Sequence, residues 1–298
     1  MSYCSRVVVQ APGKVNLSLD ITGTNDQGYH LMEMVMASID LSDILLIGRR
    51  EENELRITCS NSEIPEDDTN IVHRAAREFF RYTGLPPQGL SIHIDKRLPV
   101  EAGLAGGSAD AAGLLRGLDR LFETELSTEQ LCEIGVICGA DVPFCLVGGC
   151  CLAQGIGELL TSLAPLPRHC QFAIAKPPQG SSTRVAFRNY DQLTHRIPRP
   201  NTQAMLAAVA VGDLNGVGQN MRNVLQQVNT IEEVETLLGI MLCDGALGSV
   251  MTGTGSAVVG LFSDEKNAKR ALRHLREQVS QAYLARPLEH GAWILHCS

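Results

Sequence analysis

The 298-residue sequence lacks the features that would direct it to a nucleic acid or a membrane. It has no block of Lys and Arg, and its formal net charge is -8, whereas proteins that bind nucleic acids usually present a basic surface. No apolar stretch reaches the roughly 18 residues of a membrane-spanning helix, and the first residues show no signal-peptide core. We therefore expect a cytoplasmic protein, a monomer or homodimer, with no nucleic acid and no membrane as partner.

The ten cysteines also lack the spacing of a metal centre, because no C-x-x-C pair occurs among them. Several stand in apolar stretches, so reduced, buried thiols are expected. Charged residues make up only 19% of the chain, while apolar residues make up 44%, enough for sizeable cores. The length suggests about two domains.

The order of predicted strands and helices indicates an α+β protein with two domains, residues 1–160 and 161–298, although the boundary can only be placed within 155–200. Alternating residues at 15–21 predict a half-buried strand, and a turn at Ala11–Lys14 separates it from a strand at 6–10. Helix signals occur at 69–82, with Asp68 or Thr69 as the cap, and from Ser127, where Gln130 completes a capping box. The second domain is predicted to contain helices and strands at 202–211, 230–243, 248–252, 256–262, 264–280 and 292–297.

A glycine-rich segment from Gly103 to Gly113 leads into a helix that is predicted to begin at Ser108, with Asp110 in its first turn. Glycines let a backbone approach a ligand closely, and a helix N-terminus points unpaired N–H groups at it. The segment therefore suits phosphate binding, although a purely structural turn has the same composition. It is neither a Walker A loop nor a dinucleotide-binding fingerprint, because the required residues and spacing are missing.

Three further positions have two interpretations each. Lys14 is either a solvated lysine beside a strand or a functional amine, and Asp141 is either the cap of a short helix or a functional carboxylate. The turn Thr252–Ser256 is either an ordinary hairpin or a backbone cradle for phosphates. Sequence spacing alone does not bring these positions together.

Taken in order, these segments resemble the GHMP kinase superfamily, which includes galactokinase, homoserine kinase and mevalonate kinase. Two departures stand out: Gly13 occurs where many members have Ala, and Ala109 occurs where many have Ser, which removes a second loop hydroxyl. The resemblance extends over nearly the whole chain and is carried by Ala11–Leu19, Gly28–His30, Leu98–Pro99, Gly103–Ala112, Gly139–Pro143, Gly155–Glu158, Arg222–Leu225 and Met251–Gly255.

The resemblance implies a fold with a ribosomal protein S5 domain 2-like N-terminal domain, which binds ATP, and a ferredoxin-like C-terminal domain. It implies that Lys14 and Asp141 are the catalytic pair and that Mg²⁺ accompanies ATP near Ser108. The ATP-binding residues that it implies are Asn70, Pro99, Gly103, Leu104, Ala105, Gly106, Gly107 and Ser108.

Within the superfamily, the match is closest to the branch that phosphorylates the 2-hydroxyl of 4-diphosphocytidyl-2-C-methyl-D-erythritol in the non-mevalonate isoprenoid pathway. By this resemblance, Tyr29 and Phe187 sandwich the cytosine ring, His30 hydrogen-bonds its edge, and Asn16 contacts the substrate. The remaining substrate-binding residues that it implies are Thr183, Gly253, Thr254 and Gly255.

Three alternatives remain open at this point. The chain could phosphorylate another alcohol, such as homoserine or mevalonate, because the loop around Ser108 supports this equally. It could be a non-catalytic ligand sensor on the same fold, although Lys14 and Asp141 are both present. A serine-nucleophile amidase is the weakest alternative, because it needs a second loop serine where Ala109 stands.

Overall fold

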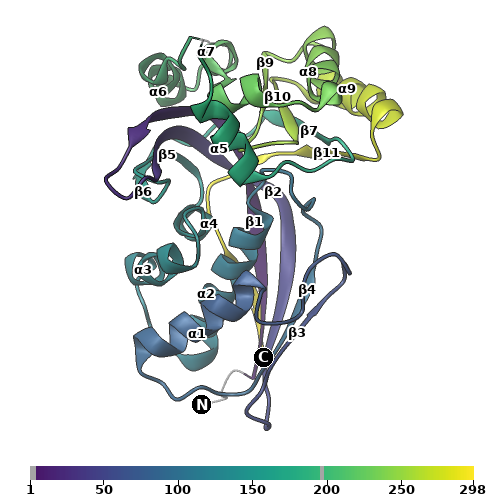
Figure 1. Ribbon diagram of the computed structural model, residues 1–298. Helices are drawn as coiled ribbons and strands as arrows, with labels where there is room; N and C mark the ends of the chain where they lie inside the picture. The colour runs from purple at the N-terminus through teal and green to yellow at the C-terminus, as the bar shows by residue number, and fades with distance from the viewer. Residues whose placement is uncertain (1–4, 195–197) are drawn as a thin grey trace.

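A large sheet with helices on one face forms the lower half of the molecule, and a smaller sheet with helices forms the upper half (Figure 1). The structure is a computed structural model that describes residues 5–194 and 198–298. The first residues, where the sequence predicts no signal-peptide core, lie mostly outside the described part. Strands and helices occur in both halves, which confirms the α+β class.

The first sheet follows the order β13-β1-β2-β4-β3, with shorter strands attached to β1 and β2. Its pairings are antiparallel except for β3 with β4 and β1 with β8. The strands are β1 (Arg6–Thr24), β2 (His30–Arg49), β3 (Leu55–Cys59), β4 (Leu90–Asp95), β5 (Cys150–Gln154), β6 (Leu159–Ser162), β8 (Arg222–Asn223), β12 (Pro287–Leu288) and β13 (Trp293–Cys297). The helices α2 (Gly106–Phe122) and α4 (Val142–Val147) pack against it, and α1 (Ile71–Thr83) and α3 (Thr128–Cys138) pack on these helices.

The second sheet is antiparallel, in the order β11-β7-β10-β9. Its strands are β7 (Gln171–Lys176), β9 (Gly248–Met251), β10 (Val258–Phe262) and β11 (Gln281–Ala285). The helices of this half are α5 (Thr183–Asp191), α6 (Thr202–Val211), α7 (Leu214–Asn220), the 3₁₀-helix η1 (Val224–Val228), α8 (Glu232–Cys243) and α9 (Glu265–Gln278).

β1 is one long strand, so the prediction of two strands separated by a turn is wrong. β2 pairs with β1 along its length, and register shifts between Pro12 and Lys14 and at two later points absorb the irregular residues. The prediction that residues 15–21 are half-buried is also wrong, because both faces of this segment are covered. Asn16 and Ser18 are therefore buried polar residues, and each forms hydrogen bonds inside the protein.

Three helix starts test the capping predictions. Ser127 caps α3 and forms the predicted capping box with Gln130, so that prediction is confirmed. The cap of α1 is Asn70, one or two residues later than predicted, because its side chain accepts a hydrogen bond from the backbone of Val72. Helix α2 begins at Gly106, so Ser108 lies inside its first turn and is not the cap.

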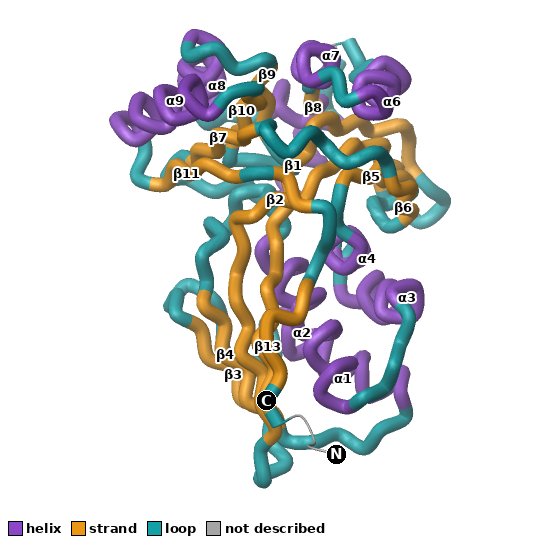
Figure 2. Tube along the Cα trace, turned by 180° about the vertical axis from the view of Figure 1, so that it is seen from behind, coloured by secondary structure: helices purple, strands orange, loops and turns teal. Residues whose placement is uncertain are grey.

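The end of the chain returns to the first sheet. The sequence predicts the strand at 292–297 as part of the second domain, but β13 pairs with β1 in the lower half, as Figure 2 shows from behind. β12 pairs with β2 in the same sheet. A boundary at residue 160 stays a prediction, and these last strands belong structurally with the first half.

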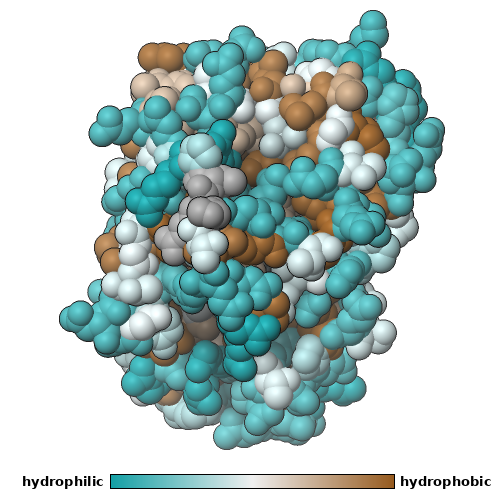
Figure 3. Space-filling model, turned by 45° about the horizontal axis from the view of Figure 1, so that its top comes forward, coloured by the Kyte–Doolittle hydropathy of each residue, from teal (hydrophilic) through white to brown (hydrophobic). Residues whose placement is uncertain are grey.

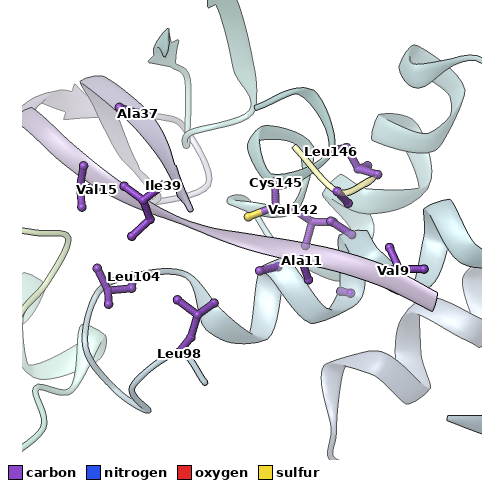
Figure 4. Packing of buried hydrophobic residues seen from close by; sticks show 14 of the residues in the cluster. Val9, Ala11, Val15, Ala37, Ile39, Leu98, Leu104, Val142, Cys145 and Leu146 are labelled. Atoms are coloured by element: carbon purple, nitrogen blue, oxygen red, sulfur yellow. The ribbon is translucent and has the colours of Figure 1, made fainter. Parts of the chain in front are cut away.

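One part of the hydrophobic core is built from β1, β2, α4 and the loop that contains Leu98 and Leu104 (Figure 4). Leu98 and Leu104 of that loop are buried against the strands, and the backbone N–H of Lys14 donates to the carbonyl of Leu104 at 3.1 Å. A Cβ atom on Gly13 would lie 2.6 Å from the side chain of Leu98. Glycine at this position therefore allows the loop to lie close to the strand.

The cysteines of the described residues are mostly inert. Eight are free thiols, and burial raises the pKa of Cys132 and Cys138 to about 11 and that of Cys150 and Cys170 to about 12. Such thiols are poor nucleophiles and metal ligands at neutral pH. Cys297 is disulfide-bonded, so the expectation of reduced thiols does not hold there. Within 5–194 and 198–298, no helix has the length and apolarity to cross a bilayer.

Candidate active site

A cavity of about 870 Å³ lies where the two halves meet, and it is lined by segments from across the chain. Lys14 from β1, the loop from Pro99 to Ser108, Asp141 at the start of α4 and the turn Gly253–Gly255 all reach its wall. On the face of the molecule in Figure 3, hydrophilic side chains cover most of the surface, and apolar side chains show between them, mainly at the upper right. The fold therefore brings together the segments that sequence spacing could not connect.

Lys14 and Asp141 lie next to each other in this cavity. The Lys14 Nζ is 3.8 Å from the Asp141 Oδ2, and the lysine is 3% exposed. Asp141 occupies the cap position of α4, as one interpretation expected, but its side chain makes no capping hydrogen bond. Its carboxylate, which is 33% exposed, is thus available to the cavity beside a buried ammonium.

Asn16 holds the lysine in place. Its Oδ1 accepts hydrogen bonds from the Lys14 Nζ at 2.6 Å and from the backbone N–H of Gly253 at 3.0 Å. Its Nδ2 lies 3.3 Å from the sulfur of Met34, and the residue is fully buried. Both the oxygen and the nitrogen of this side-chain amide therefore have partners within the protein. Direct contact of Asn16 with a substrate stays a prediction.

The glycine-rich loop presents a helix N-terminus to the cavity. Gly103 has φ +74°, Ala105 has φ +59°, and α2 starts immediately afterwards. The backbone N–H groups of Gly106, Gly107 and Ser108 are the first of the helix and have no partner within it. These groups line the cavity, which gives it the geometry of an anion site without a lysine in the loop.

We expect Gly103→Ala to raise the KM for ATP about tenfold, because a Cβ atom there would lie 2.2 Å from the carbonyl oxygen of Thr252 in a strained backbone region. Gly84→Ala is the matched control, since Gly84 has φ +69° but nothing within 4 Å of the added atom. Steady-state kinetics on both variants test this. An equal change in the two KM values would show that the contact with Thr252 does not shape the loop.

A buried ion cluster under the loop was not predicted from the sequence. The Lys96 Nζ lies 2.6 Å from Asp43 Oδ2 and 2.6 Å from Asp110 Oδ2. Burial lowers the pKa of Lys96, but the two carboxylates outweigh it, and the pKa is raised. Burial and the charge of Asp43 raise the pKa of Asp110, against the opposing effect of Lys96. The cluster ties the first turns of α2 to the first sheet.

Asn70, predicted to hold adenosine, lies in the wall of the same cavity. Its Oδ1 accepts from the backbone of Val72 and its Nδ2 donates to the carbonyl of Pro65 at 2.7 Å. Both ends of the side chain thus shape the wall formed by the start of α1 and the preceding loop. A contact with adenosine stays a prediction.

The predicted aromatic sandwich is arranged differently. His30, rather than Tyr29, stacks on Phe187, with ring centroids 4.6 Å apart and an angle of 18° between the planes. The His30 Nε2 is 2.8 Å from the Asp191 Oδ1. Phe187 lines the cavity, whereas Tyr29 is 58% exposed in a loop outside the lining. A base between Tyr29 and Phe187 stays a prediction.

The C-terminal turn reaches the cavity together with the start of α5. The Thr254 and Thr183 hydroxyls are 3.2 Å apart, and both residues line the cavity with Gly253 and Gly255. Asn223, for which no role was predicted, is buried and donates from Nδ2 to the carbonyls of Met251 and Gly253. The family resemblance includes the segment Arg222–Leu225, but it implied no function for Asn223.

The fit of a magnesium ion can be tested on these donors. No cluster of three or more His, Cys, Asp or Glu side chains that could hold a metal exists within the described residues. Ser108 and Asp141 both line the cavity, so one hydroxyl and one carboxylate face the place where phosphates would lie. Mg²⁺ is usually held by one or two carboxylates together with substrate phosphates, and this donor set fits that arrangement.

Comparison with known proteins agrees with this geometry. The family model for the GHMP kinases N terminal domain matches residues 70–149, and the model for the GHMP kinases C terminal domain matches residues 205–281. Among solved structures, a 4-(cytidine 5'-diphospho)-2C-methyl-D-erythritol kinase is 30% identical with a TM-score of 0.75, covering 96% of this chain and 97% of that one. A homoserine kinase from Cytophaga hutchinsonii has a TM-score of 0.82 at 18% identity, covering 99% of each chain, and shows the fold alone.

Curated relatives share the length of the chain as well. A 4-diphosphocytidyl-2-C-methyl-D-erythritol kinase of Caldicellulosiruptor bescii is 41% identical, covering 94% of this chain and 98% of the relative. One of Alkaliphilus metalliredigens is 38% identical, covering 97% and 99%. The predicted GHMP kinase fold is thus confirmed. The chain belongs to the 4-diphosphocytidyl-2-C-methyl-D-erythritol kinases among the GHMP kinases, and it is an ATP-dependent small-molecule kinase.

Proposed function

We propose that the chain transfers the γ-phosphoryl group of ATP to the 2-hydroxyl of 4-diphosphocytidyl-2-C-methyl-D-erythritol, with Lys14 and Asp141 at the reacting hydroxyl. The observation that carries this assignment is the 3.8 Å approach of Lys14 Nζ to Asp141 Oδ2 on the wall that also holds the glycine-rich loop. The printed names of the relatives support the choice of substrate.

In this proposal, Asp141 accepts the proton of the substrate hydroxyl while the hydroxyl oxygen bonds to the γ-phosphorus of ATP. The bond between the γ-phosphorus and the oxygen that bridges it to the β-phosphate breaks, and ADP is released. An alcohol barely ionises at neutral pH, so a carboxylate within reach makes the oxygen a better nucleophile. The ammonium of Lys14, fixed by Asn16, orients the carboxylate and offsets negative charge near the transferred group.

The phosphates of ATP would lie on the N–H groups at the start of α2, and the cavity would exclude water from the reacting atoms. Mg²⁺, when bound with ATP, would offset phosphate charge, and Ser108 and Asp141 are the residues that face it. The proposed cytidine contacts are Phe187 and His30, with Tyr29 joining only if its loop moves toward the cavity. The predicted cytoplasmic location and oligomeric state stay predictions.

An ADP-release assay tests the function. With Mg-ATP, we expect kcat/KM for 4-diphosphocytidyl-2-C-methyl-D-erythritol to exceed that for homoserine and mevalonate by about 10³-fold or more, because sites built to hydrogen-bond a group strongly reject analogues without it. Turnover of homoserine or mevalonate at a similar rate would contradict the assigned substrate. If none of the three alcohols led to ADP release, the assigned substrate would be contradicted, and other alcohols would have to be tested as acceptors for this kinase.

A further inference from the structure

The turn Thr252–Gly255 is held from two sides by buried asparagines. On one side, Asn16 accepts the N–H of Gly253, and Thr252 Oγ1 accepts the backbone N–H of Asn16 at 3.0 Å. On the other side, Asn223 donates from Nδ2 to the carbonyls of Met251 and Gly253, each at 2.7 Å. The Gly253 residue is thus fixed through both its N–H and its C=O.

Asn223 is itself rigidly placed. It is 2% exposed, and its Oδ1 accepts a hydrogen bond from the backbone N–H of Leu225 at 2.9 Å, which caps η1. Its Nδ2 donates to the backbone of the turn at the same time. Its backbone belongs to β8, which pairs in parallel with β1 so that Asn223 stands opposite Leu19. Both Nδ2 protons and the amide oxygen have partners, so a substituted side chain cannot replace all three interactions.

A continuous series of hydrogen bonds leads from Asn223 to the catalytic pair. Asn223 binds the carbonyl of Gly253, the N–H of Gly253 binds Asn16, and Asn16 binds the ammonium of Lys14 at 2.6 Å. An ideal Cβ atom on Gly253 would lie 3.4 Å from the Lys14 Nζ, which shows how closely the turn borders the lysine. Displacement of the turn would therefore move the lysine or expose it.

We infer that Asn223 is a positioning residue for phosphoryl transfer, which sets the turn Gly253–Gly255 and, through Asn16, the Lys14 ammonium. The inference rests on the proposed roles of Lys14 and the turn. It assigns Asn223 a larger effect on the acceptor side of the site than on ATP binding. Its own hydrogen bonds go to the C-terminal turn, and this turn meets the glycine-rich loop only at Gly103. A buried residue that only stabilised the fold would not divide its effects in this way.

The test is steady-state kinetics of Asn223→Ala with the natural acceptor and with ATP. We expect kcat/KM for the acceptor to fall about 10²-fold, since two buried carbonyls lose their donor and the reacting groups lose their alignment. Part of this fall is expected in the KM for the acceptor, which should rise at least about tenfold, while the KM for ATP should change by no more than about threefold. A general loss of folded enzyme would lower the apparent kcat but would change neither KM.

Two further variants keep the test decisive. Asn223→Ser retains a hydroxyl that can cap η1 but is too short to reach both carbonyls, so it should remain folded and show the same kinetic split. Asn229→Ala is the matched control, because Asn229 lies 2.9 Å from the Met251 sulfur and does not bond the turn backbone. It should leave both constants within about twofold of wild type.

The inference would be overturned if folded Asn223→Ser kept the wild-type kcat/KM and KM for the acceptor. It would also be overturned if the KM for ATP rose by as large a factor as the KM for the acceptor. These outcomes are separate from failure of the proposed function. If wild-type enzyme does not turn over the acceptor, the substrate assignment fails first. The split can then still be sought by measuring ATP affinity and cytidine diphosphate affinity calorimetrically in the wild-type, Asn223→Ser and Asn229→Ala proteins.

Discussion

Asp141→Asn is expected to lower kcat by about 10²–10⁴-fold, the usual scale for removing a general base. The amide is the same size as the carboxylate but cannot accept the proton of the hydroxyl. Because the Asp141 side chain makes no capping hydrogen bond at α4, the substitution should not disturb the helix. Single-turnover and steady-state ADP release with the cytidyl substrate measure the effect.

Asp264→Asn provides the matched control. Asp264 caps α9 in the C-terminal half, where its side chain accepts from the backbone of Asn267, and Asn caps helices as well as Asp does. The same change of charge at a helix start should therefore leave kcat unaltered. If Asp141→Asn retained wild-type kcat, Asp141 would not be the base, and the paired lysine would need another role.

The second large effect concerns stability. Lys96→Met is expected to lower the free energy of unfolding by about 3–5 kcal/mol, because it leaves Asp43 and Asp110 buried beside each other without their shared cation. Urea denaturation measures the loss. Lys269→Met is the control: Lys269 pairs with Glu265 on the exposed surface of α9, and such a pair contributes less than about 1 kcal/mol.

The loss in Lys96→Met should depend on pH with a definite sign. The pKa of Asp110 is raised above its unfolded value by burial and by Asp43. The stability associated with its proton is therefore present below the unfolded pKa and is lost as pH rises through the folded pKa. Without the lysine, this pKa rises further, so the destabilisation should be smaller at about pH 5 than at about pH 8. A loss independent of pH would show that the cluster is not the cause.

Much of the site could be predicted because its chemistry is concentrated in short segments. Gly103, Asp141 and Gly253 stand in motifs whose composition indicates turns and helix starts, and the structure places all three around one cavity. The resemblance to a known superfamily supplied their grouping, which spacing alone did not. Ser127 was recognised as a cap because a capping box is a local signal, complete within four residues.

What escaped prediction depends on contacts between distant segments. Asn16 reads as a polar residue on the open face of a strand, but the turn at Gly253, far along the chain, covers that face. No local pattern marks Lys96, because its two carboxylates come from β2 and α2, which meet only in the folded protein. Tyr29 lies outside the cavity because its loop is closed by Asn25, whose side chain accepts the Tyr29 N–H.

The return of β13 to the first sheet has a consequence for how the protein is made. The first part of β1, Val7–Gln10, has β13 as its outer neighbour, so this edge stays open while the intervening chain is still being synthesised. An open strand edge is a template for pairing with other chains. The first half can therefore begin folding on the ribosome, but its sheet is completed only when β13 emerges, and deletion of β13 should favour aggregation over a smaller folded protein.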